Sequence, residues 1–412
     1  MPIPLYLDAA RMGLMTPSAR LALQDFVRLA GETSCTLYFE GFWKNGTSSW
    51  DGALAARFPG LQVWKGVREL KEKLSGMAGA VAECSTFLAS RSTSLARRAI
   101  STLCQTCENV LVTDLTWPAY ARMIRREAMR WGRRITFIRL RQAILYGDAT
   151  PDAIAYRVIS SLVRAKCDGA FFPEVSHDGI RLPIPDLCSA VREKSPAAKI
   201  VVDGAQAFAH IPINQSIATS DCYILGCHKW LGAHLPLGVA FCAPSANGAA
   251  FWSALEKTND PLLDFVYRLE TANENRFGET VNLTPLLTCR SALADAGVVE
   301  DDLAARLKNA SLLCELLGRE WKAILPNKAF RSGVVLASAI DGKLGADALR
   351  SGFASRGVML TAYNGGIIRL SMPKIPFDTS TLELLANAFR AGKAVFQSSR
   401  TNEMRLLPAA VV

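Results

Sequence analysis

A lysine and an aspartate that follow two neighbouring apolar runs are the residues of this chain best suited to chemistry. Asp203 ends the strand-like run Lys199–Asp203, and Lys229 comes shortly after the next run, Cys222–Leu225. A carboxylate and a lysine placed in this way can hold opposite ends of one aromatic cofactor. Pyridoxal 5'-phosphate (PLP) needs such a pair, because its aldehyde forms a Schiff base with a lysine amine and its ring nitrogen must stay protonated beside a carboxylate. The sequence therefore predicts a PLP site.

The segments that must position these residues alternate between strand-like and helix-like patterns. Strand-like apolar runs are predicted at residues 109–113, 135–140, 169–175, 199–203, 222–225 and 238–242. This alternation predicts an α/β fold with a mostly parallel central sheet and helices on both faces. Ligands of such sheets bind beyond the carboxyl ends of the strands, so Thr113, Ser176, Asp203 and residues 226–229 are expected to meet at one crevice.

The pattern changes near residue 289, which predicts a smaller second domain. A long helical stretch is expected over Arg290–Ile324, then short strands and a last helix at residues 333–339, 358–362, 367–371 and 381–391. We therefore expect four parts: an N-terminal segment near the active site (1–14), a large cofactor-binding domain (15–289), a small C-terminal α+β domain (290–397) and a loosely ordered tail (398–412).

Length and cysteine usage bound the class of protein. The chain has 412 residues, 50% of them hydrophobic, and 11 cysteines that are scattered among apolar neighbours rather than spaced as a disulfide framework. Such thiols are typical of a reducing compartment, and no leader-like or membrane-spanning stretch is recognised, so a soluble cytoplasmic protein is expected. The C-x-x-C pair Cys104 and Cys107 has no second pair, so no metal site is predicted.

The net charge of +10 raises the question of a nucleic-acid partner, because arginines crowd residues 122–141. Arg122, Arg126, Arg130 and Arg133 recur at helical spacing, which is typical of a solvated helix face. No nucleic-acid-binding motif with stacking aromatics accompanies them. Attraction of anionic metabolites is therefore preferred over nucleic-acid binding.

The order of these blocks resembles that of fold-type I PLP-dependent enzymes of the class V aminotransferase and cysteine desulfurase group. The resemblance extends from Tyr6-Leu7-Asp8 to Arg369-Leu370-Ser371. Its strongest block is Val202-Asp203-Gly204-Ala205-Gln206 followed by His228-Lys229, where residue types, order and spacing all match. The weaker blocks follow in the same order as in the family.

The resemblance implies a role for each residue of the strongest block. Lys229 holds the cofactor as a Schiff base and then moves the Cα proton of the substrate, for which a lowered pKa is needed. Asp203 pairs with the ring nitrogen, and Gln206 contacts the phenolic oxygen of the ring. Without the resemblance, the lysine is an exposed residue after a strand, and the other two are turn residues.

A phosphate site is implied at residues that precede a predicted helix. Ser92, Thr93 and Ser94 resemble the Gly-Thr-Thr loop of the family, and the unpaired amides of a helix start attract anions. His228 is expected beside the phosphate, although Gly226 stands where the family has a serine. From the residues alone, the hydroxyls predict only a helix cap.

Three further residues are implied near the ring and the substrate. Trp117 lies where family members place an aromatic that stacks on the ring, and His177 occupies the family's asparagine position. Arg369 matches the arginine that binds the substrate α-carboxylate through two prongs, which implies an α-amino acid substrate. The alternatives are a core tryptophan, a satisfied histidine at a strand end and an arginine in a surface ion pair.

Two regions bear on the substrate and on assembly. Thr280 resembles the family residue that reaches the phosphate of the neighbouring subunit, which implies a homodimer with a shared active site. Arg11 is an unexpected cation in a segment where the desulfurase branch has an Asn-Ala-Ala pattern. Aromatic residues that follow could wall a substrate pocket or pack between the domains: Tyr38, Phe39, Phe42 and Trp43.

The reaction class follows from what is present and what is absent. Cysteine desulfurases carry a nucleophilic cysteine shortly before the carboxylate-binding arginine, whereas this chain has no cysteine after Leu336. We predict PLP-dependent chemistry at Cα of an α-amino acid, with an aminotransferase favoured. β-Elimination by a C–S lyase and epimerisation are the alternatives, because they differ only in which bond aligns with the ring. The remaining alternative is a catalytically silent PLP-fold protein used for binding. The presence of both Lys229 and Asp203 is evidence against it.

Overall fold

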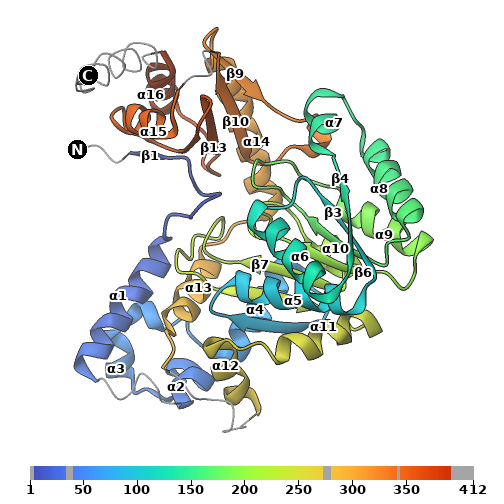
Figure 1. Ribbon diagram of the computed structural model, residues 1–412. Coiled ribbons are helices and arrows are strands. Elements are labelled where there is room, and N and C mark those ends of the chain that lie inside the picture. The colour runs from blue at the N-terminus through green and yellow to red at the C-terminus, as the bar shows by residue number, and fades with distance from the viewer. Residues whose placement is uncertain (1–3, 34–39, 272–279, 341–343, 391–412) are drawn as a thin grey trace, which may run out of the picture.

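The computed structural model describes residues 4–33, 40–271, 280–340 and 344–390. In this part of the chain, a larger and a smaller sheet lie in two adjoining bodies, each with its own helices (Figure 1). The predicted tail at 398–412 lies outside the described residues, as do Tyr38, Phe39 and the segment 276–279.

The large sheet has seven strands in the order β2-β8-β7-β6-β5-β3-β4. Strands β7 to β4 are parallel, whereas β8 is antiparallel to both of its neighbours. The strands are β2 (Ser85–Ala89), β3 (Asn109–Thr113), β4 (Arg134–Ile138), β5 (Gly169–Pro173), β6 (Lys199–Asp203), β7 (Cys222–Gly226) and β8 (Gly238–Cys242). The predicted α/β fold with a mostly parallel sheet is therefore confirmed. Strand β2 was not predicted, because Ser85 and Thr86 interrupt its apolar pattern.

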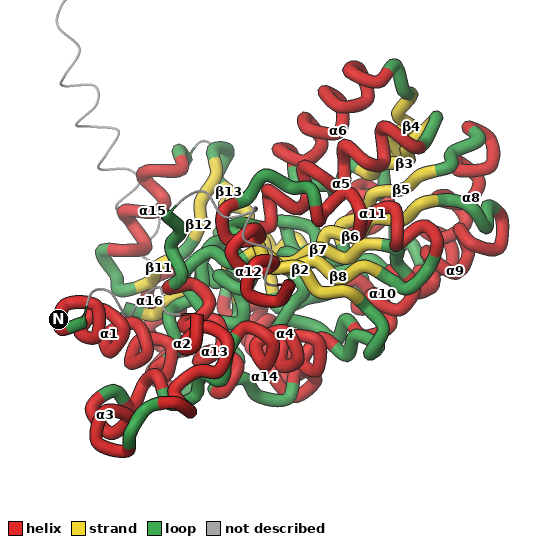
Figure 2. The backbone as a smooth tube through the Cα atoms, turned by 90° about the horizontal axis from the view of Figure 1, so that it is seen from below, coloured by secondary structure: helices red, strands yellow, loops and turns green. Residues whose placement is uncertain are grey.

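Helices cover both faces of this sheet (Figure 2). Successive strand residues point to opposite faces, so Val110 and Val112 pack on one side and Leu111 on the other. The first face carries α5 (Ser92–Thr106), α6 (Pro118–Trp131) and α11 (Ala246–Glu256). The larger cluster on the second face takes side chains from α1 (Pro17–Glu32), α2 (Glu40–Asn45), α4 (Val67–Ala78), α7 (Arg141–Tyr146), α8 (Pro151–Ala165), α9 (Ile184–Lys194), α10 (Asn214–Thr219), α12 (Pro261–Thr271) and α13 (Thr284–Ala294).

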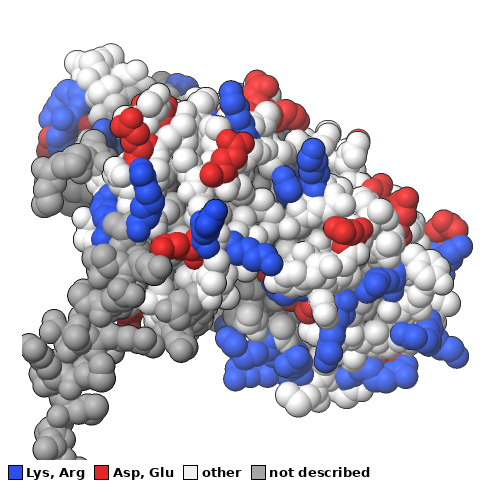
Figure 3. Space-filling model, turned by 90° about the horizontal axis from the view of Figure 1, so that it is seen from above, with Lys and Arg blue, Asp and Glu red and all other residues white. Residues whose placement is uncertain are grey.

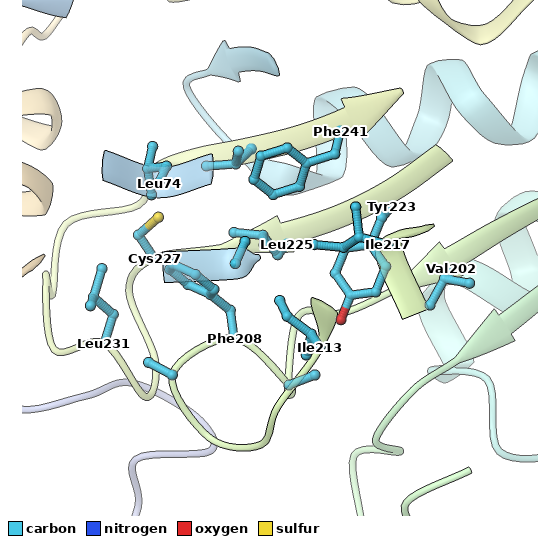
Figure 4. Close-up of a cluster of buried hydrophobic side chains, with 14 of the residues drawn as sticks. Leu74, Val202, Phe208, Ile213, Ile217, Tyr223, Leu225, Cys227, Leu231 and Phe241 are labelled. Atoms are coloured by element: carbon cyan, nitrogen blue, oxygen red, sulfur yellow. The ribbon is translucent and has the colours of Figure 1, made fainter. Parts of the chain in front are cut away.

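Short helical turns complete the large domain at α3 (Gly52–Arg57) and at the 3₁₀ segments Gly46–Ser49 and Pro59–Leu61. Figure 4 shows part of the larger cluster, in which Tyr223 and Leu225 of β7 lie with Phe208, Ile213 and other apolar side chains. Burial of these side chains holds the ends of β6 and β7 in place. Asp203 is the last residue of β6, and Lys229 comes just beyond the end of β7.

The small domain is built on a four-stranded antiparallel sheet with the order β12-β13-β10-β9. Its strands are β9 (Trp321–Ile324), β10 (Val334–Ala339), β12 (Thr361–Tyr363) and β13 (Ile367–Ser371). Its helices are α14 (Val299–Leu316), α15 (Ala346–Ala354) and α16 (Thr379–Arg390), with a 3₁₀ turn at Lys328–Phe330. The four strands and three helices share one apolar cluster, apart from that of the large domain.

The N-terminal strand packs with the small domain, although the two are far apart in the sequence. Strand β1 (Leu5–Tyr6) pairs in parallel with β11 (Val358–Met359), and Leu7 is buried in the small-domain cluster. The chain then passes to α1 of the large domain, as Figure 1 shows. Residues 8–13 therefore cross between the two domains, and we call them the crossing segment.

Two predicted elements of the small domain are wrong. The helical stretch Arg290–Ile324 is instead the end of α13, all of α14 and strand β9. Gly318, with φ at +61°, takes a left-handed conformation after α14, and the chain then pairs with β10. The predicted strand 358–362 is two strands with different partners. The domain division at residues 289 and 290 stays a proposal; α13, through which it passes, packs on α1.

The first part of the arginine-rich stretch lies on α6, whose buried face holds Tyr120, Ile124 and Ala128. Arg122, Arg126 and Arg130 are exposed, as predicted for a solvated face. Arg133, predicted to share that face, lies beyond the end of α6 and pairs with Glu108. Figure 3 shows acidic side chains among the basic ones over much of the face that it draws. Among the described residues, no helix combines the length and the apolar character that crossing a bilayer requires.

Candidate active site

A cavity of about 290 Å³ lies at the carboxyl ends of the parallel strands, next to the small domain. It is lined by most of the residues predicted from the sequence, namely Ser92, Thr93, Trp117, His177, Asp203, Gln206, His228, Lys229 and Arg369. Ser94 and Thr280 are not among its lining residues. Ser94 is half-buried within α5, and Thr280 is exposed before α13.

Asp203 is the carboxylate of the cavity floor. It ends β6 and is only 8% exposed. The Ala205 amide donates to Oδ1 over 3.0 Å, which leaves Oδ2 for a ligand. Burial raises the pKa of Asp203, while Ala205 and the cation of Lys229 oppose that change. A cationic ring nitrogen placed here would restore the charged carboxylate.

Lys229 provides the amine of the same cavity. Burial lowers the pKa of Lys229 to about 8, with Arg369 acting in the same direction and Asp203 against it. The backbone around it is tightly packed: a Cβ on Gly13 would lie 1.9 Å from the carbonyl oxygen of Lys229. Only glycine fits at that position, so the crossing segment passes directly over the lysine backbone.

The start of helix α5 forms the opposite end of the cavity. Its N-cap residue, Arg91, makes no side-chain cap hydrogen bond, so no side chain caps the first amides of the helix, although the Ser94 amide donates to the Arg91 carbonyl over 3.1 Å. Ser92 and Thr93 add hydroxyls at this position, and Tyr120 lines the same cavity. Open amides, hydroxyls and the positive end of the helix dipole together form an anion site.

His228 lies beside this anion site. A Cβ on Gly226 would come 3.1 Å from Cε1 of His228 and 3.4 Å from Oγ of Ser92. The imidazole therefore fills the space next to the position where the family has a serine. Burial, aided by the cations of Lys229 and Arg91, lowers the pKa of His228 to about 4, and its Nδ1 is buried without a partner among the described residues.

Gln206 lines the cavity, but protein groups already engage both ends of its amide. Nε2 donates to the Ala10 carbonyl over 2.7 Å, and Oε1 accepts from Trp230 Nε1 over 3.0 Å. Trp230 stacks on the fully buried His210 at 3.6 Å, and Arg306 of α14 lies over the Trp230 ring. Gln206 thus ties the crossing segment to the contact between the domains. Its predicted contact with the phenolic oxygen of the ring stays a prediction.

Trp117 lies at the mouth of the cavity rather than in the core. It is 44% exposed and makes an edge contact with Tyr120, at 5.1 Å between ring centroids. Its position just before α6 follows from Pro118, which begins that helix. An exposed indole beside a cavity offers an aromatic surface to a planar ligand.

Arg369 reaches the cavity from the middle of β13, and its guanidinium is only partly free. Nη2 lies 3.3 Å from Asp8 Oδ1 and 3.3 Å from Thr361 Oγ1, and Nη1 donates to the His177 carbonyl over 3.0 Å. Nε is buried without a partner among the described residues. The chain therefore holds a buried cation whose charge is balanced by Asp8 and which keeps one donor for a ligand.

His177 follows Ser176 at the end of the β5 loop and lines the same cavity. Burial and the cations of Arg141, Arg369 and Lys229 lower the pKa of His177 to about 4. The imidazole is therefore neutral at pH 7, so it can form hydrogen bonds but adds no charge.

The predicted aromatic wall is wrong for the residues that can be placed. Phe42 and Trp43 are buried in an aromatic cluster with Trp50, Trp64 and Phe265, and neither lines the cavity. They pack within the large-domain cluster rather than between the domains, as the alternative interpretation had it.

Some lining residues were not among the predicted site residues. Tyr120 lies three positions after Trp117, so helical spacing brings both to one face, a signal that the sequence contained. Ala10 and Arg11 belong to the crossing segment, and only the pairing of β1 with the small domain brings them to the cavity. Asp8, which pairs with Arg369, was recognised as part of a block but not as a site residue.

Residues 62–249 match the family model described as aminotransferase class V. This segment makes up less than half of the chain, and its match fits the predicted family. The matched part includes the start of α5, Asp203 and Lys229, so the predicted family is confirmed on the residues that carry the site. A search of curated proteins by sequence gave no match.

Solved structures share the fold of this protein over nearly the whole chain. The cysteine desulfurase CsdA from Escherichia coli has a TM-score of 0.69 at 14% identity, covering 95% of each chain. An alanine–glyoxylate aminotransferase from Nostoc sp. has a TM-score of 0.66 at 16% identity, covering 95% of this chain and 96% of that one. A mutant of C-DES with glycine covalently linked to its PLP cofactor has a TM-score of 0.67 at 16% identity, with 94% and 96% coverage. At these identities, the likeness shows the fold.

The residues of the class V site fit PLP on the cavity's own geometry. A buried carboxylate, a lysine of lowered pKa and an open helix start occupy separate walls of one cavity. Three residues that line the cavity each have a buried polar atom without a partner among the described residues: Nδ1 of His177, Nδ1 of His228 and Nε of Arg369. A phosphorylated pyridine aldehyde supplies a charge or an acceptor to each of these groups.

Proposed function

We propose that this class V protein is a PLP-dependent enzyme that acts at Cα of an α-amino acid, as an aminotransferase. The observation that carries the proposal is the meeting of Asp203 and Lys229 in one buried cavity with the open start of α5. When bound, PLP supplies an electron-withdrawing ring that stabilises negative charge left at Cα. The chain's own residues bind, orient and move protons around that ring.

Each end of the cavity has one task. The amides and hydroxyls of Ser92 and Thr93, with neutral His228, hold the phosphate. Asp203 keeps the ring nitrogen protonated. Trp117 covers one face of the ring. Because the pKa of Lys229 is lowered to about 8, its amine would hold the cofactor through its aldehyde, with release of water, and would accept and return the Cα proton of the substrate near neutral pH.

Arg369 binds the α-carboxylate of the substrate and thereby orients Cα over Lys229. Its Nε is buried without a partner in the described part of the chain, and its Nη1 donates to the His177 carbonyl. A carboxylate that enters must share the guanidinium with Asp8. We also propose a homodimer, in which Thr280 contributes to the phosphate site of the other subunit; the exposure of Thr280 supports this assignment. A cytoplasmic location stays a prediction from the cysteines.

β-Elimination by a C–S lyase is the competing proposal, since it needs the same base and the same ring. One experiment separates the two. The purified protein with bound PLP is incubated with L-amino acids and cysteine conjugates, with and without a keto acid as amino acceptor. Formation of a keto acid that depends on the acceptor supports transamination. Pyruvate and ammonia formed without an acceptor would overturn it in favour of the lyase. If neither product forms and no Lys229-dependent absorbance appears, the chain is a silent fold.

A further inference from the structure

The crossing segment carries a cation into the cavity that the proposed reaction does not use. Arg11 lines the cavity together with Lys229 and Arg369, and Asp203 is the single carboxylate residue among the lining residues. Asp203 serves the ring nitrogen, and Arg369 is already balanced by Asp8. Arg11 makes no ion pair with any of the described residues. It is therefore a positive charge without a counter-charge at the substrate side.

The backbone on both sides of Arg11 is held in place, so its position is defined. The Ala10 amide donates to Ser371 Oγ over 2.9 Å, and the Ala10 carbonyl accepts from Gln206 over 2.7 Å. The Gly13 amide donates to the His228 carbonyl over 2.8 Å. Both domains thus fix the crossing segment next to Arg11. A residue held in this way loses less freedom on binding a ligand than one on a loose loop.

Arg11 and Arg369 both line the cavity, and Asp8 links them. The Arg11 amide donates to the Asp8 carbonyl over 2.9 Å, and Asp8 Oδ1 lies 3.3 Å from Arg369 Nη2. Arg11 and Arg369 therefore belong to one end of the site, whereas Lys229 and Asp203 form the floor. His177, which also borders this end, is neutral at pH 7, because its pKa lies near 4. It neither adds to nor cancels the charge.

We propose that Arg11 is a specificity-determining residue that binds an anionic group on the substrate side chain. The substrate class is then an α-amino acid with a second acidic group, such as a side-chain carboxylate. This inference rests on the proposed function, in which Arg369 takes the α-carboxylate. Planar two-pronged binding of carboxylates is the typical use of arginine in such a place. Arg11 is exposed, so solvent screens the contact and the expected gain is moderate.

The test compares ligands that differ by one carboxylate, on the protein with bound PLP. Succinate and glutarate, which do not react, are compared with butyrate and pentanoate by isothermal calorimetry. We expect the dicarboxylates to bind about tenfold more tightly, as one charge-assisted contact implies. Arg11→Ala should abolish that preference and leave butyrate binding unchanged. Arg11→Lys should restore part of it. Arg20→Ala, which removes an exposed arginine of α1, is the matched control and should keep the wild-type ratio.

Turnover gives a second, independent measurement. The ratio of kcat/KM for L-aspartate over L-asparagine, and for L-glutamate over L-glutamine, should fall about tenfold in Arg11→Ala. If the protein shows Lys229-dependent cofactor absorbance and turns over amino acids, but Arg11→Ala leaves both ratios unchanged, the role of Arg11 is refuted and the proposed function stands. If no Lys229-dependent absorbance forms, the proposed function fails and the inference fails with it.

Discussion

The two ends of the cavity are built in different ways. At the cofactor end, Asp203, His228 and Lys229 follow neighbouring strands of one sheet, within a short stretch of the large domain. The substrate end combines Asp8 and Arg11 of the crossing segment with Arg369 of β13. A local sequence pattern is enough to find the first end. The second exists only because the N-terminal strand pairs with the small domain.

Their electrostatics differ as well. The floor has a buried acid and a buried amine whose pKa values are shifted by burial, which suits proton transfer. The substrate end holds two guanidiniums and one balancing carboxylate, which suits binding of anions. Changes at the floor should therefore act on the rate of chemistry, and changes at the substrate end on affinity. Four predictions test this division.

The largest effect is expected at the floor. Lys229→Ala removes the base, so turnover should fall by about 10³- to 10⁴-fold, with loss of the absorbance that depends on this lysine. Steady-state rates and a visible spectrum measure it. Lys65→Ala, which removes an exposed lysine outside the cavity, should behave as wild type. Normal turnover in Lys229→Ala would contradict the assignment of the floor.

At the substrate end, Arg369→Gln should raise KM for amino acids by about 10- to 100-fold, the value of one hydrogen-bonded charge contact, with a smaller change in kcat. Asp8→Asn should act in the opposite direction and lower KM several-fold, because Asp8 competes with the substrate for the same guanidinium. Steady-state kinetics separates the two parameters. A matching fall in kcat for Arg369→Gln would place this residue with the chemistry instead.

Trp117 should contribute to affinity for the cofactor alone. An aromatic contact is worth about 0.5–1.5 kcal/mol, so Trp117→Ala should weaken PLP binding by a few-fold to about tenfold. Trp117→Phe should recover most of this loss. Because the side chain is 44% exposed, the melting temperature of the apoprotein should hardly change. A large fall in that temperature would show that packing is its main role.

The smallest expected effect is a pH shift. Lys229 reacts as the neutral amine, so the rate at which the apoprotein takes up PLP should rise with pH and level off above about 8. Asp203 raises the pKa of Lys229 and Arg369 lowers it. The midpoint should therefore move down in Asp203→Asn and up in Arg369→Gln, by a fraction of a unit. Rapid mixing of apoprotein and PLP at several pH values measures these midpoints. If they do not move in the two variants, the charges of Asp203 and Arg369 do not act on Lys229.

Much of the large domain was predictable, because most strands of its sheet, the antiparallel β8 included, are apolar runs. Strands 109–113, 199–203 and 238–242 have the predicted bounds. The small domain was less predictable, because β9 follows α14 closely and the residues of β9 also suit a helix. The glycine turn at Gly318 separates the two only in the folded chain.

The sequence by itself determined the resemblance to class V enzymes, the α/β fold and the residues of the floor, because strand ends and the residues after them keep a fixed order along the chain. Only the tertiary structure decided which residues form the proposed substrate end. The pairing of Asp8 with Arg369, the position of Arg11 and the exposure of Trp117 depend on contacts between segments far apart in the chain. Such contacts follow from the packing of one domain on the other, which no local pattern of residue types encodes.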